Sequence, residues 1–225
     1  MAAATDAAIL IVGETGTGKE MLARAIHQAN PRARMPFVAL NCGALPRELV
    51  ESELFGFRRG AFTGAYNDAP GIFSAASGGT VFLDEIGEMA QRRPGEAVAR
   101  AARRRTAPGG QHQEVHVDVR VVSATNRPLN ELRSALLRED LYFRIATVGV
   151  QVPPLRARQE DILVLTQHFA ARLSCRYGRE ISLSRSALEL LLRYPFPGNV
   201  RELESLIESA SAVSADNPQS ITTKT

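Results

Sequence analysis

Short apolar runs alternate with helical patterns over the first part of the chain. Five runs have the length of buried strands, at residues 8–12, 36–42, 79–85, 115–126 and 148–152. Between them, residues 21–27 predict a helix, and residues 45–54 predict another that starts at a proline. Residues 56–71 are rich in glycine and aromatics and predict a long loop or a loop-tipped hairpin. Strands that alternate with helices predict an α/β fold, a parallel sheet with helices on both faces.

The pattern changes after Pro153 and Pro154, and only helical patterns follow. They predict three helices, over residues 161–177, 184–194 and 199–212, the second with a capping serine. We therefore predict two domains, an α/β domain at residues 1–154 and a small helical domain at residues 155–215. Residues 216–225 are polar and form a frayed tail in this prediction.

An octapeptide between the first predicted strand and the first predicted helix has the spacing of a phosphate-binding loop. Glycines let backbone N–H groups converge on phosphate oxygens, the helix N-terminus adds partial positive charge, and Lys19 can reach the β- and γ-phosphates. The generic pattern ends in Ser or Thr for magnesium, whereas this chain has Glu20. An ordinary strand-to-helix turn is the alternative, but it requires neither the spaced glycines nor the lysine. The candidate nucleotide-binding residues are Gly13, Glu14, Thr15, Gly16, Thr17, Gly18, Lys19 and Glu20.

Two acidic residues end the third predicted strand. Asp84 and Glu85 offer the hard oxygen ligands that magnesium needs and a base that orients water. We expect Asp84 to contact the metal and Glu85 to polarise the attacking water. Such a pair alone is weak evidence, because acids often end strands, but behind a phosphate-binding loop it becomes strong. Asn126, at the end of the fourth strand, is a candidate sensor of the γ-phosphate, with a turn-forming asparagine as the alternative.

Composition and charge narrow the class of protein. The 225 residues are 44% hydrophobic and 23% charged, as in ordinary globular proteins. The net charge is +3, but residues 92–105 hold six arginines and one acid, which is +5 and leaves −2 for the rest. This argues against a spread nucleic-acid surface. No apolar run reaches the roughly 20 residues of a membrane span, and no secretory signal is apparent. Cys42 and Cys175 predict buried thiols in a reducing cytoplasm.

A hexapeptide in the glycine-rich segment carries a family resemblance. Gly60, Ala61, Phe62, Thr63, Gly64 and Ala65 form the GAFTGA signature. Further matching segments are residues 13–20, 51–60, 82–86, 124–126, 138–144 and 197–203. Over nearly its whole length the chain closely resembles the AAA+ domain of sigma-54-dependent transcriptional activators. The phosphate-binding loop of that family also ends in Lys-Glu, so Glu20 fits the resemblance.

The resemblance implies an ATPase that uses ATP and Mg²⁺ and has a three-layer AAA+ sandwich followed by a helical lid. It also implies a ring, usually hexameric, with ATP between subunits, that remodels the closed promoter complex of sigma-54 RNA polymerase. Phe62 and Thr63 would lie at the tip of the loop that presses on sigma-54. An exposed aromatic residue at this tip requires a partner that covers it. A phenylalanine folded into the core is the alternative.

The resemblance further assigns roles to side chains. Arg138 and Arg144 match arginine fingers, which stabilise charge on the transferring phosphoryl group of a neighbouring subunit. Any single surface arginine is otherwise a solvated charge, so these two assignments depend on the resemblance. The other roles are Lys19 for phosphate, Asp84 for magnesium, Glu85 for water, Asn41 for restraint of the catalytic glutamate, Asn126 for the first sensor and Arg201 for the second.

The chain departs from the family pattern at several places. It starts almost directly at the strand before the loop, and no helix-turn-helix follows the helical domain, so we expect no direct binding to enhancer DNA. Phe196 stands where the family commonly has tryptophan. Between residues 88 and 111 the resemblance stops and then resumes. We interpret this segment as a pair of compensating frameshifts, near Gln91 and near Pro108, because a shifted frame can encode the leucine-rich helix of the family.

Two alternatives stand beside the activator hypothesis. An AAA+ ATPase with another client has the same fold, but the hexapeptide argues against it. A truncated or frameshifted remnant would bind nucleotide or sigma-54 without turnover, and the early start and the altered segment favour it. ATP binding without hydrolysis would distinguish such a remnant from an active enzyme.

Overall fold

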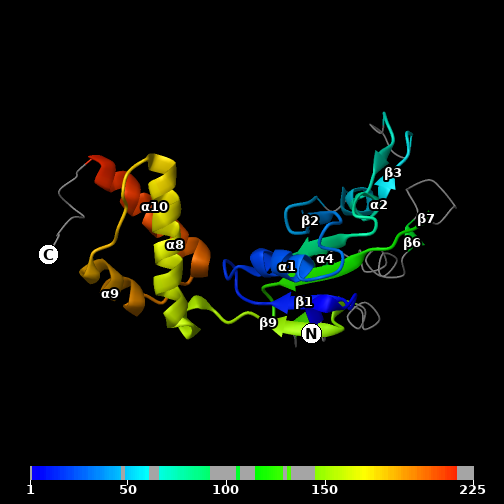
Figure 1. The fold of residues 1–225 in the computed structure, drawn as a ribbon. Coiled ribbons are helices and arrows are strands. Elements are labelled where there is room, and N and C mark those ends of the chain that lie inside the picture. Colours follow the sequence, from blue (N-terminus) through cyan, green and yellow to red (C-terminus); the bar gives the residue numbers. More distant parts are fainter. Residues whose placement is uncertain are drawn as a thin grey trace. The chain divides into compact units, whose positions relative to one another are not determined.

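The computed structural model describes residues 2–46, 49–60, 66–91, 105–106, 115–128, 131–132 and 145–216. The chain divides into two compact units (Figure 1). The first contains Met1–Gly13 and Lys19–Gln151, and the second contains Glu14–Gly18 and Val152–Thr225. A short piece of the glycine-rich loop therefore belongs with the C-terminal helices.

The first unit is built on a five-stranded parallel sheet, as the alternating pattern predicts. Its strands, in spatial order, are β2 (Phe37–Asn41), β5 (Thr80–Asp84), β8 (Arg120–Thr125), β1 (Ile9–Val12) and β9 (Val148–Gln151). The central three strands are almost fully buried, which fits the apolar runs in β1 and β5, whereas β8 also buries Arg120, Ser123 and Thr125. Because parallel strands end at one edge, the residues that follow β2, β5, β8 and β1 gather there.

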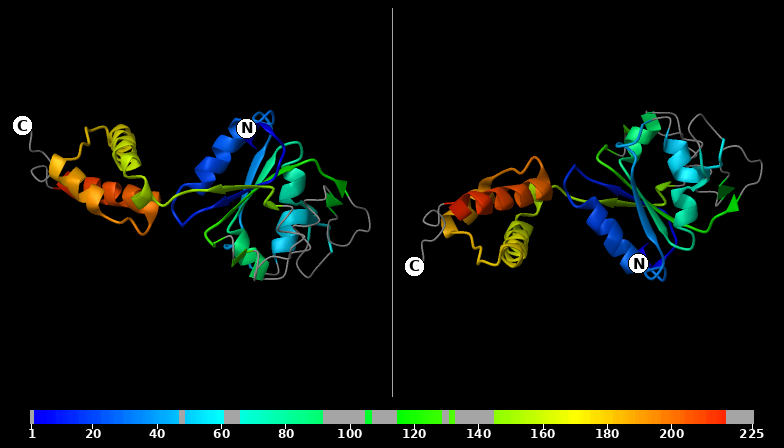
Figure 2. Two further views of the ribbon diagram at one scale, coloured as in Figure 1. Left: turned by 90° about the horizontal axis from the view of Figure 1, so that it is seen from below. Right: turned by 90° about the horizontal axis from the view of Figure 1, so that it is seen from above.

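Helices cover both faces of this sheet (Figure 2). Helix α1 (Lys19–Gln28) lies on one face, where His27 Nδ1 and Thr80 Oγ1 are 2.9 Å apart. The other face carries the short helices α2 (Val50–Phe55), α3 (Ile72–Ala75) and α4 (Ile86–Gln91). A 3₁₀ turn, η1 (Ala2–Ala4), precedes β1.

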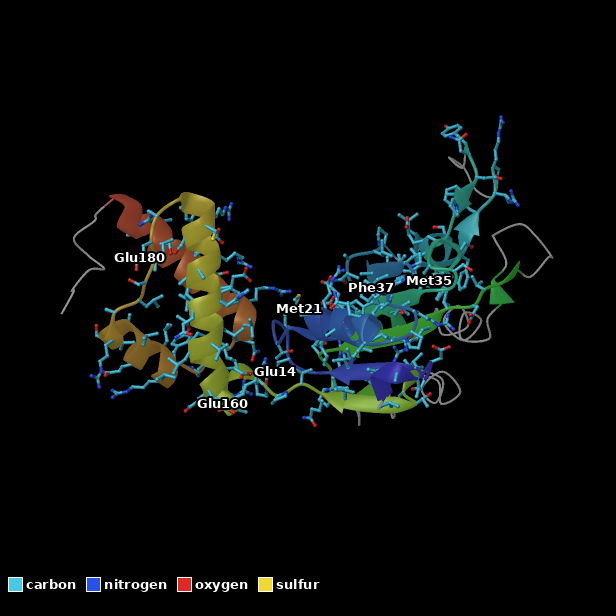
Figure 3. The ribbon with its side chains drawn as sticks, in the orientation of Figure 1. Glu14, Met21, Met35, Phe37, Glu160 and Glu180 are labelled. Carbon is cyan, nitrogen blue, oxygen red and sulfur yellow. The ribbon has the colours of Figure 1, made fainter. Side chains whose placement is uncertain are left out.

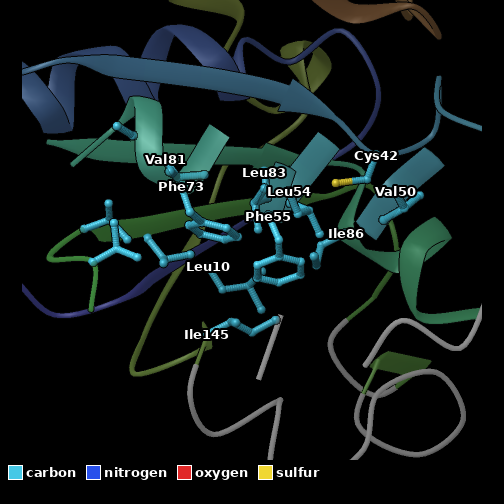
Figure 4. Packing of buried hydrophobic residues seen from close by; sticks show 14 of the residues in the cluster. Leu10, Cys42, Val50, Leu54, Phe55, Phe73, Val81, Leu83, Ile86 and Ile145 are labelled. Atoms are coloured by element: carbon cyan, nitrogen blue, oxygen red, sulfur yellow. The ribbon is translucent and has the colours of Figure 1, made fainter. Parts of the chain in front are cut away.

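The main hydrophobic core lies between the sheet and α2, α3 and α4 (Figure 4). Leu10 and Leu83 enter it from the strands, and Phe55 and Phe73 stack there with ring centroids 5.6 Å apart. Cys42 is buried in the same cluster, as predicted, whereas Cys175 is exposed. The expectation of two buried thiols is therefore wrong for Cys175.

Two predicted elements differ from the structure. The helix predicted over residues 45–54 begins only at Val50, because Asn41 Oδ1 accepts the amides of Gly43 and Ala44 (2.8 and 3.2 Å) and holds a non-helical turn. The strand predicted over residues 115–126 is interrupted: β7 (Val115–His116) pairs antiparallel with β6 (Arg105–Thr106). The sheet strand starts at Arg120 because its neighbour β5 starts at the paired Thr80. Most of the arginine-rich segment 92–105 lies outside the described residues.

The segment of residues 56–71 forms the base of a hairpin, one of the two predicted alternatives. Strand β3 (Gly56–Phe57) pairs antiparallel with β4 (Ala69–Pro70). A Cβ on Gly56 would lie 2.3 Å from Ala69 O, and one on Gly71 would lie 2.3 Å from Gly56 N, so only glycine fits at either position. Asp68 joins the two arms by accepting from the Arg59 amide and the Arg58 guanidinium.

The second unit has the predicted helices α8 (Gln159–Tyr177), α9 (Arg185–Arg193) and α10 (Asn199–Asp216), preceded by the 3₁₀ turn η4 (Leu155–Ala157). Ser184 caps α9 as expected, since its side chain accepts from the amide of Ala187. The core contains Phe169 and Leu203, and Phe196 is fully buried in it. No helix among the described residues has the length and apolarity to cross a membrane.

Candidate functional site

The loop of residues 13–20 has the backbone that a phosphate-binding loop needs. Gly16 has φ +79° and Gly18 has φ +94°, in the left-handed region where side chains are strained. Thr17 is buried, and its hydroxyl donates to Glu14 O (2.8 Å), which closes the turn. The glycine spacing in the sequence is therefore a conformational requirement at these two positions.

The lysine of the motif starts α1 in the first unit. Lys19 is 8% exposed, and its Nζ donates to Gly13 O at 2.9 Å. The amide of Gly13, the first residue after β1, donates to Thr125 O at the end of β8 (3.1 Å). The ammonium group is thus held at the start of the loop. Glu20 is exposed and pairs with Arg24 one turn along α1 (2.8 Å).

The two acids lie at the carboxyl edge of the sheet beside Asn41. Asn41 is paired with Asp84 in the β2–β5 register, and Asp84 Oδ1 accepts from the amide of Glu85 (2.9 Å). Glu85 has φ +55°, an uncommon value for a residue with a side chain. Backbone strain of this kind persists where the surroundings fix it, often at functional sites.

Gly43 provides the space in which the Glu85 carboxylate lies. A Cβ on Gly43 would be 2.0 Å from Glu85 Oε2 and 3.2 Å from Asn41 Oδ1. The carboxylate of Glu85 and the side-chain carbonyl of Asn41 therefore both lie near the backbone of Gly43, whose amide donates to Asn41 Oδ1. The sequence analysis missed Gly43, and nothing in its local pattern indicates this contact.

The buried thiol beside this edge is chemically inert. Burial raises the pKa of Cys42 to about 12, and the charges of Asp84 and Glu85 act in the same direction. A thiol with such a pKa stays protonated at neutral pH and is not a nucleophile.

Asn126 follows β8 at the same edge. Its neighbour Thr125 is opposite Val12 in the β1–β8 register, one residue before Gly13. The side chain of Asn126 is exposed. The next residue, Arg127, pairs with Glu88 of α4 (2.8 Å), and this ion pair was not anticipated from the sequence.

Within the second unit, the N-terminus of α10 lies against the loop piece Glu14–Gly18. The amide of Arg201 donates to Gly16 O (3.3 Å), so the candidate second sensor is adjacent to the loop. Asn199, Arg156 and Arg158 also contact this piece, and the sequence analysis gave them no role. The match of residues 197–203 to the family motif was the available signal for Asn199.

Several predicted site residues lie outside the described residues. These are Arg138 and Arg144, together with residues 61–65 of the hexapeptide. Gly60, at its start, is described and exposed, with φ +83°. Among the described residues no group of three or more His, Cys, Asp or Glu side chains could hold a metal ion alone. Asp84 and Glu85 supply oxygen ligands of the type that suits Mg²⁺, which commonly completes its shell with phosphates and water.

The parallel sheet has a glycine-rich loop and a held lysine between β1 and α1, and two acids at the end of β5, which is separated from β1 by β8. These features define a P-loop nucleotide-binding protein with a helical lid. Family comparison specifies it further. The Sigma-54 interaction domain matches residues 1–151 and the AAA+ ATPase lid domain matches residues 156–224. The chain belongs to the family of sigma-54 interaction domains.

Characterised relatives support this membership. The Nif-specific regulatory protein of Azotobacter vinelandii is 44% identical over 212 residues, covering 94% of this chain and 41% of the relative. The DNA-binding transcriptional regulator NtrC of Azospirillum brasilense is 47% identical over 215 residues, covering 93% of this chain and 44% of the relative. The chain thus spans less than half the length of these relatives.

Solved structures share the fold. NtrX from Brucella abortus in complex with ADP superposes with a TM-score of 0.87 at 33% identity, over 97% of this chain and 48% of that one. NtrX in complex with ATP gives a TM-score of 0.86 at 32% identity, over 98% of this chain and 51% of that one. The predicted AAA+ fold with a helical lid is therefore confirmed.

Proposed function

We propose that this chain is the ATP-hydrolysing domain of a transcription activator that remodels RNA polymerase carrying sigma-54. The observation that carries the proposal is the match to the sigma-54 interaction domain over the unit that also holds the P-loop and Asp84-Glu85. The solved NtrX complexes with ADP and ATP support a nucleotide ligand. The polymerase is a cytoplasmic enzyme, so we also propose a cytoplasmic location.

The proposed reaction is attack of water on the γ-phosphate of ATP. The loop amides and Lys19 bind the phosphates, and Asp84 would hold Mg²⁺, which would supply positive charge to the phosphate oxygens. Glu85 orients the water and accepts its proton, while Asn41 restrains the Glu85 carboxylate above Gly43. Asn126 and Arg201 sense the nucleotide.

The proposed assembly is a homo-oligomeric ring, a hexamer in its usual form. Arg138 and Arg144 act on the nucleotide of a neighbouring subunit in this assembly. Residues 60–65 contact sigma-54 from the hairpin whose base Gly56 and Gly71 form. The arms of this hairpin are joined by Asp68, which gives the contact loop a defined attachment.

Steady-state ATP hydrolysis against protein concentration tests the enzymatic part. Specific activity should rise with concentration, because the trans arginines require assembly, and Lys19→Ala should abolish it. Gln28→Ala, at the other end of α1, is the matched control and should retain the activity. A wild-type chain that binds ATP but shows no turnover at any concentration would refute the ATPase proposal and identify a non-catalytic remnant.

Binding to purified sigma-54 in the presence of ATP tests the partner. Phe62→Ala should abolish this binding while ATP hydrolysis persists. Tyr66→Ala is the matched control, since Tyr66 is an aromatic residue of the same hairpin that is 81% exposed and lies outside the hexapeptide. Equal loss in both variants, or loss in neither, would contradict a specific role for the hexapeptide.

A further inference from the structure

The carbonyl groups of three consecutive loop residues are all held by the helical unit. The donors come from the turn before α8 and from the start of α10, and all belong to the same compact unit as the loop piece Glu14–Gly18. The bonds are Asn199 Nδ2 to Thr15 O (3.0 Å), Val200 N and Arg201 N to Gly16 O (2.9 and 3.3 Å), and an Arg158 guanidinium nitrogen to Thr17 O (2.9 Å).

Holding these carbonyls fixes where the following amides point. Across a trans peptide the C=O of one residue and the N–H of the next point in opposite directions, and no cis peptide bond occurs in the described part of the chain. The N–H groups of Gly16, Thr17 and Gly18 are therefore turned away from the helical unit. Thr17 N makes only a long bond of 3.4 Å to Glu14 O. Loop amides of this kind bind phosphate oxygens in P-loops.

Asn199 is the central residue of this contact. Its side chain is fully buried, and its Nδ2 donates to both Thr15 O and Glu14 Oε2 (3.0 and 3.1 Å). Its Oδ1 accepts from the amide of Leu155 (2.8 Å). The residue has φ +54°, which is uncommon outside glycine. Replacing the buried Nδ2 donor by an acceptor would therefore cost free energy, because Thr15 O and Glu14 Oε2 would then face another acceptor.

Arg156 and Gly198 complete the attachment of the loop. Two guanidinium nitrogens of Arg156 donate to the two carboxylate oxygens of Glu14 (2.8 and 2.5 Å), near the first turn of α8 (Figure 3). The hydrogen bonds from Arg156 and Asn199 lower the pKa of Glu14 to about 2, so the pair is ionised at neutral pH. A Cβ on Gly16 would lie only 2.2 Å from Gly198 O, so the two backbones touch directly.

We propose that Asn199 and Arg156 are positioning residues that attach the phosphate-binding loop to the helical unit and thereby aim its amides at the nucleotide. The inference deepens the proposed function and depends on nucleotide binding by this loop. It gives the helical unit a direct means of changing nucleotide affinity, because displacement of Asn199 releases the carbonyls of the loop and lets its peptides rotate.

Two variants and one control test the proposal. Asn199→Asp keeps the shape but replaces the donor by an acceptor that faces Glu14 Oε2 and Thr15 O. Arg156→Gln removes the ion pair at a position whose side chain is 47% exposed, so folding is preserved there. Arg176→Gln is the matched control, because Arg176 forms an exposed arginine–glutamate pair with Glu208 (3.0 Å) that is remote from the loop in sequence.

Amide exchange in nucleotide-free protein is the first readout. First-turn amides of a helix lack intrahelical acceptors, so the protection of the Val200 and Arg201 amides reports their bonds to Gly16 O. Affinity for a fluorescent ATP analogue is the second readout. Asn199→Asp should lower the protection of both amides and weaken nucleotide binding about tenfold, and Arg156→Gln should act in the same direction by about threefold.

The outcomes separate this inference from the proposed function. Loss of amide protection and of affinity in Asn199→Asp and Arg156→Gln, with Arg176→Gln unchanged, supports the inference. Wild-type affinity in Arg156→Gln and in a folded Asn199→Asp overturns it while leaving nucleotide binding intact. If Asn199→Asp does not fold, the exposed Arg156→Gln decides alone. A wild-type chain that binds no nucleotide overturns the proposed function, and the attachment then serves only the fold.

Discussion

Replacing Gly43 by alanine should impair hydrolysis by displacing one carboxylate. The new Cβ would lie 2.0 Å from Glu85 Oε2, whereas ordinary van der Waals contact begins at 3.4 Å, so the oxygen must move by about 1.4 Å. The end of a glutamate side chain moves easily, so we expect a stability change below about 0.5 kcal/mol and a shift of the melting temperature within about 2 °C. The position of the carboxylate relative to the attacking water, however, changes.

The expected kinetic effect is confined to turnover. Misplacement of a catalytic group by about 1 Å can cost about 100-fold in rate, so we expect kcat for ATP hydrolysis to fall by about 10- to 100-fold. This corresponds to about 1.4–2.7 kcal/mol of activation free energy. The KM for ATP should change by less than about twofold, because in the proposed reaction Glu85 acts on the water and not on the bound phosphates.

Steady-state kinetics with two controls test this reasoning. Gly149→Ala is the matched substitution, because a Cβ on Gly149 meets no atom within 4 Å, and its kcat should equal that of the wild type. In a Glu85→Gln background, Gly43→Ala should add little further loss, since the group that it displaces is already inactive. An undiminished kcat in Gly43→Ala, or an equal loss in the Glu85→Gln background, would refute the role of Gly43 in placing Glu85.

Three further outcomes are expected. The Glu14–Arg156 pair stabilises the folded state above the unfolded pKa of Glu14, and this stabilisation is lost as the pH falls toward the folded pKa of about 2. The difference in free energy of unfolding between the wild type and Glu14→Gln should therefore be constant from pH 8 to 5 and disappear as the pH falls below that range. Urea unfolding at each pH measures this difference. Maleimide should label Cys175 and leave Cys42 unmodified in the native protein at pH 7.5, as mass spectrometry of the peptides would show; fast labelling of both would contradict the burial of Cys42. Phe73→Ala should lower the free energy of unfolding by about 3–5 kcal/mol, because the ring is fully buried, and a loss below about 1 kcal/mol would contradict its place in the core.

The sheet and the lid helices were predictable because their signals are local. Strand β1 and residues 81–83 of β5 are apolar runs, and the lid helix α8 carries apolar residues at helical spacing. Errors arose where a partner far away in the sequence decides the element. The strand at Arg120 starts where its neighbour starts, at Thr80, and the helix at Val50 starts late because Asn41 captures the preceding turn.

Only the residues of the candidate site that belong to a sequence motif could be predicted from the sequence. Gly16, Gly18 and Lys19 follow from a spacing that one strand–loop–helix unit explains. The contacts of Gly43 with Glu85 and of Asn199 with Glu14 join segments separated by 42 and 185 residues in sequence. No periodicity or composition encodes such contacts, so they become visible only once the chain is folded.

The hairpin base has a consequence for the loop to which the proposed function assigns partner binding. Its attachment depends on the backbone approach of Gly56 and Gly71 and on the hydrogen bonds of Asp68. Each of these contacts is made by residues 56–59 and 68–71, which flank the hexapeptide. If the proposed function holds, a different peptide between Arg59 and Asp68 should change the partner that the domain recognises while the flanking contacts of the hairpin base persist.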